Sequence, residues 1–306
     1  MSNQILCARL AAGVAALTAM TAHASGHGFA GSRFFPATLA TDDPFVADEL
    51  SLPTVSGIVA PGDDGPEVND TEFSVDIAKR ITTNFGVEVG ATYLNLKPKG
   101  GSTISGFDNV GLGAKYQLDV DPEHEMIWAI GVDADLGGTG AAQVGAEDFT
   151  TLTPSVFFGK GFDDMADKTS WARAFALTGS AGVSFPTRSQ SDGASNPDVF
   201  NLGLALEYSI PYLQAQVKDA GLGAPFNRMI PVVELTLEAP FDGGGTTGTI
   251  NPGVLWAGQY VQLGAEAVIP MNERTGRHVG FIAQLHFFLD DLFPDAFGRP
   301  LFGGGR

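Results

Sequence analysis

The chain has almost no cysteine and no long apolar run. Its single cysteine, Cys7, lies in the first 24 residues. Past that point a disulfide, a thiol nucleophile and a thiolate metal site are excluded. No later stretch reaches the roughly 18 consecutive apolar residues that a membrane-spanning helix needs. If this chain resides in a membrane, it has to cross it as a closed β-barrel.

Basic residues are also scarce, with 17 Lys and Arg against 35 Asp and Glu in 306 residues. This balance argues against nucleic acid as a partner, because binding to phosphates needs a basic surface. The charged fraction is only 17% and the chain holds 40 glycines. Such a composition also argues against a disordered polyelectrolyte.

Residues 1–24 have the pattern of a secretory signal peptide. A start with one base and no acid is followed by the short apolar run LAAGVAALTAMTA, and Ala22-His23-Ala24 matches a small-residue cleavage site. We expect the mature chain to begin at Ser25, with 16 basic and 35 acidic residues and a net charge of −19.

The rest of the chain repeats one pattern, in which apolar residues alternate with small or polar ones between turns. In VGFIAQLHF, which starts at Val279, every apolar position except Ile282 falls on one face of a strand. That face is either the core of a soluble sandwich or the lipid-facing band of an outer-membrane barrel. The pattern predicts twelve strands, over residues 50–59, 71–81, 85–96, 107–118, 125–136, 149–161, 170–185, 199–209, 228–239, 248–257, 260–269 and 279–288.

Loops and aromatics favour the barrel. The odd connections are long and polar and the even ones short, as in barrels with both termini in the periplasm. Residues 210–227 are an exception, where Leu213, Val217 and Ala220 predict a short amphipathic helix. Aromatics at the ends of strands beside the even connections resemble an interfacial girdle: Phe85, Tyr116, Trp128, Trp171, Tyr208, Trp256 and Tyr260. The predicted fold is therefore an all-β, antiparallel transmembrane β-barrel of about twelve strands over residues 50–288, in the outer membrane of a Gram-negative bacterium.

Two segments lie outside this pattern. Residues 25–49 form an irregular leader, which either plugs the lumen or hangs in the periplasm. Residues 289–306 form a C-terminal periplasmic tail. Phe287 or Phe288 supplies the terminal aromatic that the barrel assembly machinery is expected to recognise during biogenesis.

The polar face of the strands is acidic. Such a lumen favours cations or neutral solutes over anions. An alternative is that its carboxylates pair with bases in a plugged barrel. The predicted lumen-lining residues are Asp76, Glu88, Lys115, Asp133, Asp135, Glu207, Glu234, Glu238 and Glu266.

No residue set predicts catalysis, a metal or a cofactor. A barrel hydrolase needs a Ser and a His oriented by a third group; His286 is placed on the lumen face and His278 at the outer rim, with no motif beside either. We expect a protein that is not an enzyme. Three acidic clusters lack the spacing of a calcium loop and are interpreted as solvated: Asp63-Asp64, Asp163-Asp164 with Asp167, and Asp290-Asp291.

Three segments of the chain resemble a family of outer-membrane barrels grouped with the phenol meta-pathway transporters: TDDPFVADELSLPTV, FSVDIAKRITTNFGVEVGATY and FDNVGLGAKYQL. The resemblance implies that small aromatic or hydrophobic compounds cross the outer membrane. The hypothesis is a channel or transporter for a small solute. The alternatives are a structural or surface-interaction barrel with a plugged lumen, a secreted β-sandwich and a barrel hydrolase.

Overall fold

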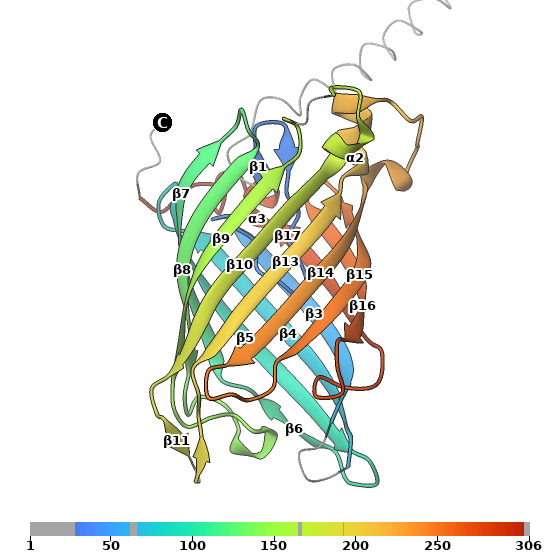
Figure 1. Ribbon diagram of the computed structural model, residues 1–306. Helices are drawn as coiled ribbons and strands as arrows, with labels where there is room; N and C mark the ends of the chain where they lie inside the picture. The colour runs from blue at the N-terminus through green and yellow to red at the C-terminus, as the bar shows by residue number, and fades with distance from the viewer. Residues whose placement is uncertain (1–27, 62–65, 165–166, 192, 303–306) are drawn as a thin grey trace, which may run out of the picture.

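The computed structural model describes residues 28–61, 66–164, 167–191 and 193–302, which form a closed antiparallel barrel of twelve strands (Figure 1). Each barrel strand pairs with the next along the chain, and the first, β3, pairs with the last, β17, which closes the sheet. The predicted fold class is confirmed. The strands are β3 (Glu49–Ala60), β4 (Val68–Arg80), β5 (Phe85–Pro98), β7 (Val110–Asp121), β8 (Met126–Leu136), β9 (Thr151–Gly161), β10 (Phe175–Pro186), β13 (Val199–Tyr208), β14 (Met229–Pro240), β15 (Thr247–Ala257), β16 (Val261–Pro270) and β17 (Gly280–Phe288).

The barrel wall exposes apolar side chains outward and buries polar ones inside. On β8, Trp128, Ile130 and Val132 are 41–43% exposed, whereas Glu207 on β13 and Glu234 on β14 are at most 1% exposed. In a soluble protein the large apolar residues are the buried ones. The apolar exterior therefore contacts lipid, and the protein is an outer-membrane barrel of the Gram-negative type.

Strand β3 forms although Pro53 and Gly57 interrupt its alternation. The register with β4 shifts between Ser51 and Thr54, so a bulge accommodates the proline, which cannot donate to the ladder. Gly57 lies opposite Phe281 of β17, and a Cβ atom there would come within 2.5 Å of the Phe281 ring. The glycine thus makes room for the aromatic side chain at the pair that closes the barrel.

The two ends of the barrel differ. One end, here called the loop end, carries the long polar connections, including β6 (Ile104–Phe107), η2 (Ala142–Val144) and the hairpin of β11 (Gln190–Ser191) and β12 (Ala194–Ser195). The other, here called the leader end, carries the start of the leader with β1 (Phe29–Ala30) and β2 (Arg33–Phe34), together with η3 (Trp171–Ala174), α2 (Ile210–Tyr212) and α3 (Leu289–Leu292) (Figure 1). This division agrees with the predicted alternation of long and short connections.

Most predicted strand boundaries lie within three residues of the observed ones, and two predictions near the leader end were wrong. The strand predicted over 170–185 begins at Phe175, because Trp171–Ala174 form a 3-10 turn capped by the Ser170 hydroxyl, which accepts from the Ala172 N–H at 3.2 Å. The short helix predicted within residues 210–227 forms, but it ends before Ala220. Helical turns cover α2 and η4 (Leu213–Val217) and stop at Lys218, whose backbone is extended; η5 (Phe226–Arg228) follows, so Ala220 is not helical.

Two of the predicted features cannot be compared with the structure. The predicted signal peptide and the Asp63-Asp64 cluster lie outside the described residues. Among the described residues, no helix is long and apolar enough to cross a membrane. The leader ends one residue earlier than expected, since Glu49 already belongs to β3.

Candidate functional site

The leader turns into the barrel from the leader end and contacts the inner wall. At its innermost bend, the backbone N–H groups of Leu39, Ala40 and Thr41 donate to the carboxylate of Glu234 at 2.7, 2.9 and 2.6 Å. The Gln262 side-chain amide donates to the Ala37 carbonyl at 2.7 Å. Glu234 lies near the middle of β14, so the leader reaches well into the lumen.

Apolar contacts accompany these hydrogen bonds. Near the leader end, the inner wall carries a patch of fully buried apolar residues, against which Phe34 and Leu39 of the leader pack: Ala205, Ile230, Val232 and Leu255. Phe35 and Phe45 pack in a second cluster with Ile127 of β8. An apolar inner wall would be poorly suited to water. The leader covers it, so wall and leader have complementary surfaces.

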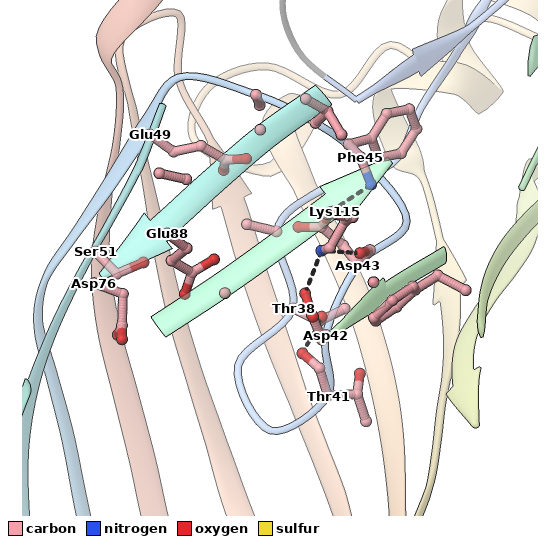
Figure 2. Close-up of a pocket in the computed structure, with 18 of the residues that line it drawn as sticks. Thr38, Thr41, Asp42, Asp43, Phe45, Glu49, Ser51, Asp76, Glu88 and Lys115 are labelled. Atoms are coloured by element: carbon pink, nitrogen blue, oxygen red, sulfur yellow. Dashed lines mark hydrogen bonds and ion pairs between the residues drawn. The ribbon is translucent and has the colours of Figure 1, made fainter. Parts of the chain in front are cut away.

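A lysine of the barrel wall contacts the leader on the side of the lumen opposite Glu234. The Lys115 ammonium on β7 donates to the Asp42 carboxylate at 2.8 Å and to the Asp43 carbonyl at 2.6 Å (Figure 2). It also lies 4.6 Å from the centroid of the Phe157 ring. Burial raises the pKa of the Asp43 carboxyl to about 7, with Lys115 acting in the opposite direction and Glu49 adding to the rise.

Buried ion pairs fix both ends of the leader at the rim of the barrel. Arg33 contacts Glu125 at 3.1 Å and donates to the Ala174 carbonyl at 3.1 Å. Asp48 accepts from Arg80 at 2.9 Å and from Lys79 at 2.8 Å. The leader is therefore a strap, attached at two points of the rim and bent inward between them.

Between the strap and the wall lies a cavity of about 330 Å³. Leader residues 37–47 form one side, and β3, β4, β5, β7, β8, β9 and β17 form the other. Lys115 and His286 are the basic side chains that line it. Six carboxylates line it too, from Asp42, Asp43, Glu49, Asp76, Glu88 and Asp133 (Figure 2 labels all but the last).

The nine residues predicted to line the lumen fall into three groups. Asp76, Glu88, Lys115 and Asp133 come together around the cavity. Glu207, Glu234 and Glu266 are buried on β13, β14 and β16, on the side that the leader covers. Asp135 and Glu238 lie nearer the loop end and are exposed to solvent.

Sequence reasoning missed the partners that the leader supplies. Asp42, Asp43 and Asp48 are acidic residues in a segment with no strand pattern, and Lys115 was one of very few bases assigned to the lumen. Opposite charge was therefore a usable signal for the Lys115 contact. The pairing of Arg33 with Glu125 had no comparable signal, because Arg33 lies outside the predicted barrel strands and Glu125 is only the first residue of one.

A serine, a histidine and a glutamate also line the cavity in contact with one another. The Ser51 hydroxyl lies 3.0 Å from Nδ1 of His286, and Nε2 of His286 lies 2.7 Å from a carboxylate oxygen of Glu49. The register opposes Ser51 to His286 and Glu49 to Phe288 on β17. The expectation that His286 faces the lumen had not included these two partners.

The remaining acidic clusters engage cations or hydroxyls of the chain. Asp163 pairs with Arg173 and accepts from the Tyr212 hydroxyl at 2.7 Å. Asp290 lies 3.6 Å from Arg80. His278, placed at the outer rim by the sequence, lies 3.3 Å from Glu67 at the loop end.

No protein-family model matches this chain, and no curated protein matches it. Among solved structures, it is similar to an outer membrane channel from Pseudomonas putida F1, with a TM-score of 0.59 and 9% identity, over 83% of this chain and 99% of that one. KdgM porin and NanC porin each align with a TM-score of 0.48, at 9% and 10% identity, over 78% and 77% of this chain and 98% of theirs. The chain therefore shares the barrel fold of that outer-membrane protein.

Proposed function

We propose that this protein is an outer-membrane channel for a small solute and that the leader is an internal plug which gates it. The observation that supports this proposal is the strap. It hydrogen-bonds to Glu234 in mid-barrel, covers an apolar inner wall and leaves an acidic cavity beside it. The similarity of fold to an outer membrane channel supports the same proposal.

The solute is proposed to be neutral or cationic. Carboxylates dominate the cavity lining, and a pore lined by fixed negative charge concentrates cations and repels anions. The resemblance to the phenol meta-pathway transporters implies an aromatic or hydrophobic solute, which stays a prediction. Outer-membrane lipid surrounds the barrel. The barrel assembly machinery is the proposed partner during biogenesis, with Phe288 at the end of β17 as its terminal aromatic.

The test is planar-bilayer conductance of the whole chain against a variant that lacks residues 28–45 and keeps Asp48 at the rim. The deletion variant is expected to conduct several times more current, because the strap no longer fills the lumen. Heat modifiability on a gel verifies that both are folded barrels. A folded deletion variant without conductance would reject the channel and leave the structural barrel with a plugged lumen.

A second candidate function, ester hydrolysis, rests on the Ser51, His286 and Glu49 contacts alone. In such a site the Ser51 oxygen adds to the ester carbonyl carbon while His286 takes its proton and passes it to the departing alkoxide. Water then releases the acid and restores Ser51. The measurement is hydrolysis of 4-nitrophenyl butyrate. Turnover has to disappear in Ser51→Ala and persist in Ser56→Ala, a control on the same strand; any other result removes this candidate.

A further inference from the structure

Glu266 on β16 reaches across a glycine toward the residue that holds the strap. The register opposes Glu266 to Gly253 of β15, and Gly253 in turn to Val232 of β14. A Cβ atom at Gly253 would lie 2.4 Å from Cγ of Glu266, so the glutamate side chain lies over the space that the glycine leaves. Its carboxyl group comes within hydrogen-bonding reach of Glu234.

The two glutamates have different surroundings. Glu234 accepts three backbone N–H groups from the strap, which stabilise its charged form. Glu266 is 5% exposed, and both of its oxygens are buried without a donor among the described residues. The same holds for Oδ1 of Asn251, which is 1% exposed and lies opposite Glu234 on β15. The strands beside Glu234 therefore carry three buried side-chain oxygens that accept no hydrogen bond from the described residues.

No base of the described chain neutralises this pair. The charged group that interacts with Glu234 besides Glu266 is Glu207 on β13, which in turn interacts with Arg33 and Asp43 of the leader. Arg33 is already engaged by Glu125 and by two carbonyl groups, those of Ala174 and Arg173. Two carboxyl groups in contact inside a low-dielectric interior do not both ionise, because the repulsion between like charges is too large.

We propose that Glu234 and Glu266 form a one-proton site that latches the strap. Glu266 holds the proton and donates it in a hydrogen bond to Glu234, whose other acceptor sites take the N–H groups of residues 39–41. Loss of the proton replaces a hydrogen bond by repulsion and loosens the strap. The latch is thus closed at low pH and opens as pH rises. As a gate it rests on the proposed function, but the proton site itself does not.

The first test is infrared spectroscopy of the intact protein. A buried, protonated Glu266 is expected to contribute a carboxylic-acid C=O stretch that disappears in Glu266→Gln and persists in Asp43→Asn. If the Glu266→Gln spectrum retains the whole acid band, no proton resides on Glu266 and the proposal is overturned. This measurement does not depend on conductance, so it can succeed where the channel proposal fails.

The second test follows opening of the latch. The mature chain is expected to have no cysteine, so Thr41→Cys introduces a single thiol at the innermost bend while keeping the N–H of residue 41. Maleimide labelling of this thiol is expected to rise with pH by up to about tenfold per pH unit through the titration. In Glu266→Gln the part of this rise that Glu266 causes should be absent, so labelling should rise less with pH than in the parent, because the amide donates to Glu234 without titrating. In Glu266→Leu it should be fast at every pH.

Three results would overturn the latch. One is labelling that does not depend on pH, measured against a free thiol to correct for thiol ionisation. Another is a Glu266→Gln profile equal to that of the parent. The last is labelling at fixed pH that slows with added sodium or calcium ions, since the site would then hold a metal cation in place of the proton. Heat modifiability confirms that each variant is a folded barrel.

Discussion

The Nζ atom of Lys115 on β7 lies 2.8 Å from the Asp42 carboxylate of the leader. This ion pair joins the barrel wall to the strap on the side opposite Glu234. The strap is thereby held between two charges of the wall, one cation and one anion. Because the Lys115–Asp42 contact is polar and the Asp42 carboxylate is 47% exposed, this contact can break without unfolding the barrel.

Substitution of Lys115 by alanine is expected to loosen the strap. The Asp42 carboxylate is 47% exposed, so the pair is worth only about 1 kcal/mol, or roughly fivefold in the open population. Labelling at Thr41→Cys should accelerate by that factor. Lys99→Ala is the matched control, because Lys99 is 78% exposed and far weaker in its contact, at 3.8 Å from Glu67.

The same variant permits chemical rescue. Removal of the Lys115 ammonium empties a cage made of the Asp42 carboxylate, the Asp43 carbonyl and the Phe157 ring. Methylammonium in solution is expected to enter this cage and slow the labelling again, whereas methanol should not. Equal effects of the two additives would contradict the role of the positive charge.

Neutralising the cavity carboxylates is expected to reduce cation preference. Asp76, Glu88 and Asp133 line the cavity, and each charge acts on a passing ion through water. At about 1 kcal/mol for a water-screened contact, one neutralisation should lower the ratio of cation to anion permeability about fivefold. Reversal potentials of the leader-deleted barrel measure this ratio for Asp76→Asn, Glu88→Gln and Asp133→Asn. Glu147→Gln, exposed in the loop between β8 and β9, serves as the control.

An anion preference in the leader-deleted parent, or equal ratios in all four variants, would show that these carboxylates do not line the conduction path. Either outcome would reject the lumen assignment of these residues while leaving the barrel fold intact.

The docked strap should weaken as pH rises from about 4 to 7, through Asp43. Burial, opposed by Lys115, raises the pKa of Asp43 from 3.8 to about 7 in the docked state. A raised carboxyl pKa means that the docked state binds the proton more tightly than the released state. Docking is therefore unaffected below pH 3.8, is lost progressively up to about 7, and changes no further above that. Asp43→Asn should reduce, without abolishing, the rise of labelling over this window, because the amide does not titrate and keeps the bond from the Phe45 N–H.

Asp43 and Glu266 act in the same direction and can be separated. In the Asp43→Asn background, Glu266→Gln should still remove the remaining pH dependence of labelling. If the single Asp43 variant already gives a flat profile, Glu266 contributes nothing to release within the pH range tested.

The barrel could be predicted from the sequence because each strand is specified by the residues within it. A period of two, with turns between, specifies each strand without knowledge of its neighbours. The start of β10 was misplaced because residues 170–174 satisfy their backbone through a capped 3-10 turn, which the apolar pattern does not reveal.

The site was harder to predict, because it forms only when the barrel closes around the leader. Glu234 meets Leu39 across 195 positions of sequence, and Lys115 meets Asp42 across 73. The polar face of each strand predicted which wall residues point inward, but the leader has no periodicity to place it. Gly253, whose missing side chain admits Glu266, could be seen in the sequence only as a break in a strand.

Substitution of Arg33 is expected to destabilise the leader end of the barrel more than any change at Lys115. Arg33 is fully buried; it contacts Glu125, the Ala174 carbonyl and the face of the Tyr212 ring, 3.6 Å from its centroid. Arg33→Ala leaves the buried Glu125 without its cation, which costs about 3–5 kcal/mol. Arg33→Lys should lose much of the same energy, because an ammonium cannot reproduce the forked contacts of a guanidinium.

The measurement is the temperature of unfolding on heat-modifiability gels, with Arg299→Ala in the exposed tail as control. If the double variant Arg33→Met, Glu125→Met is no more stable than Arg33→Ala, the loss does not come from the unpaired carboxylate.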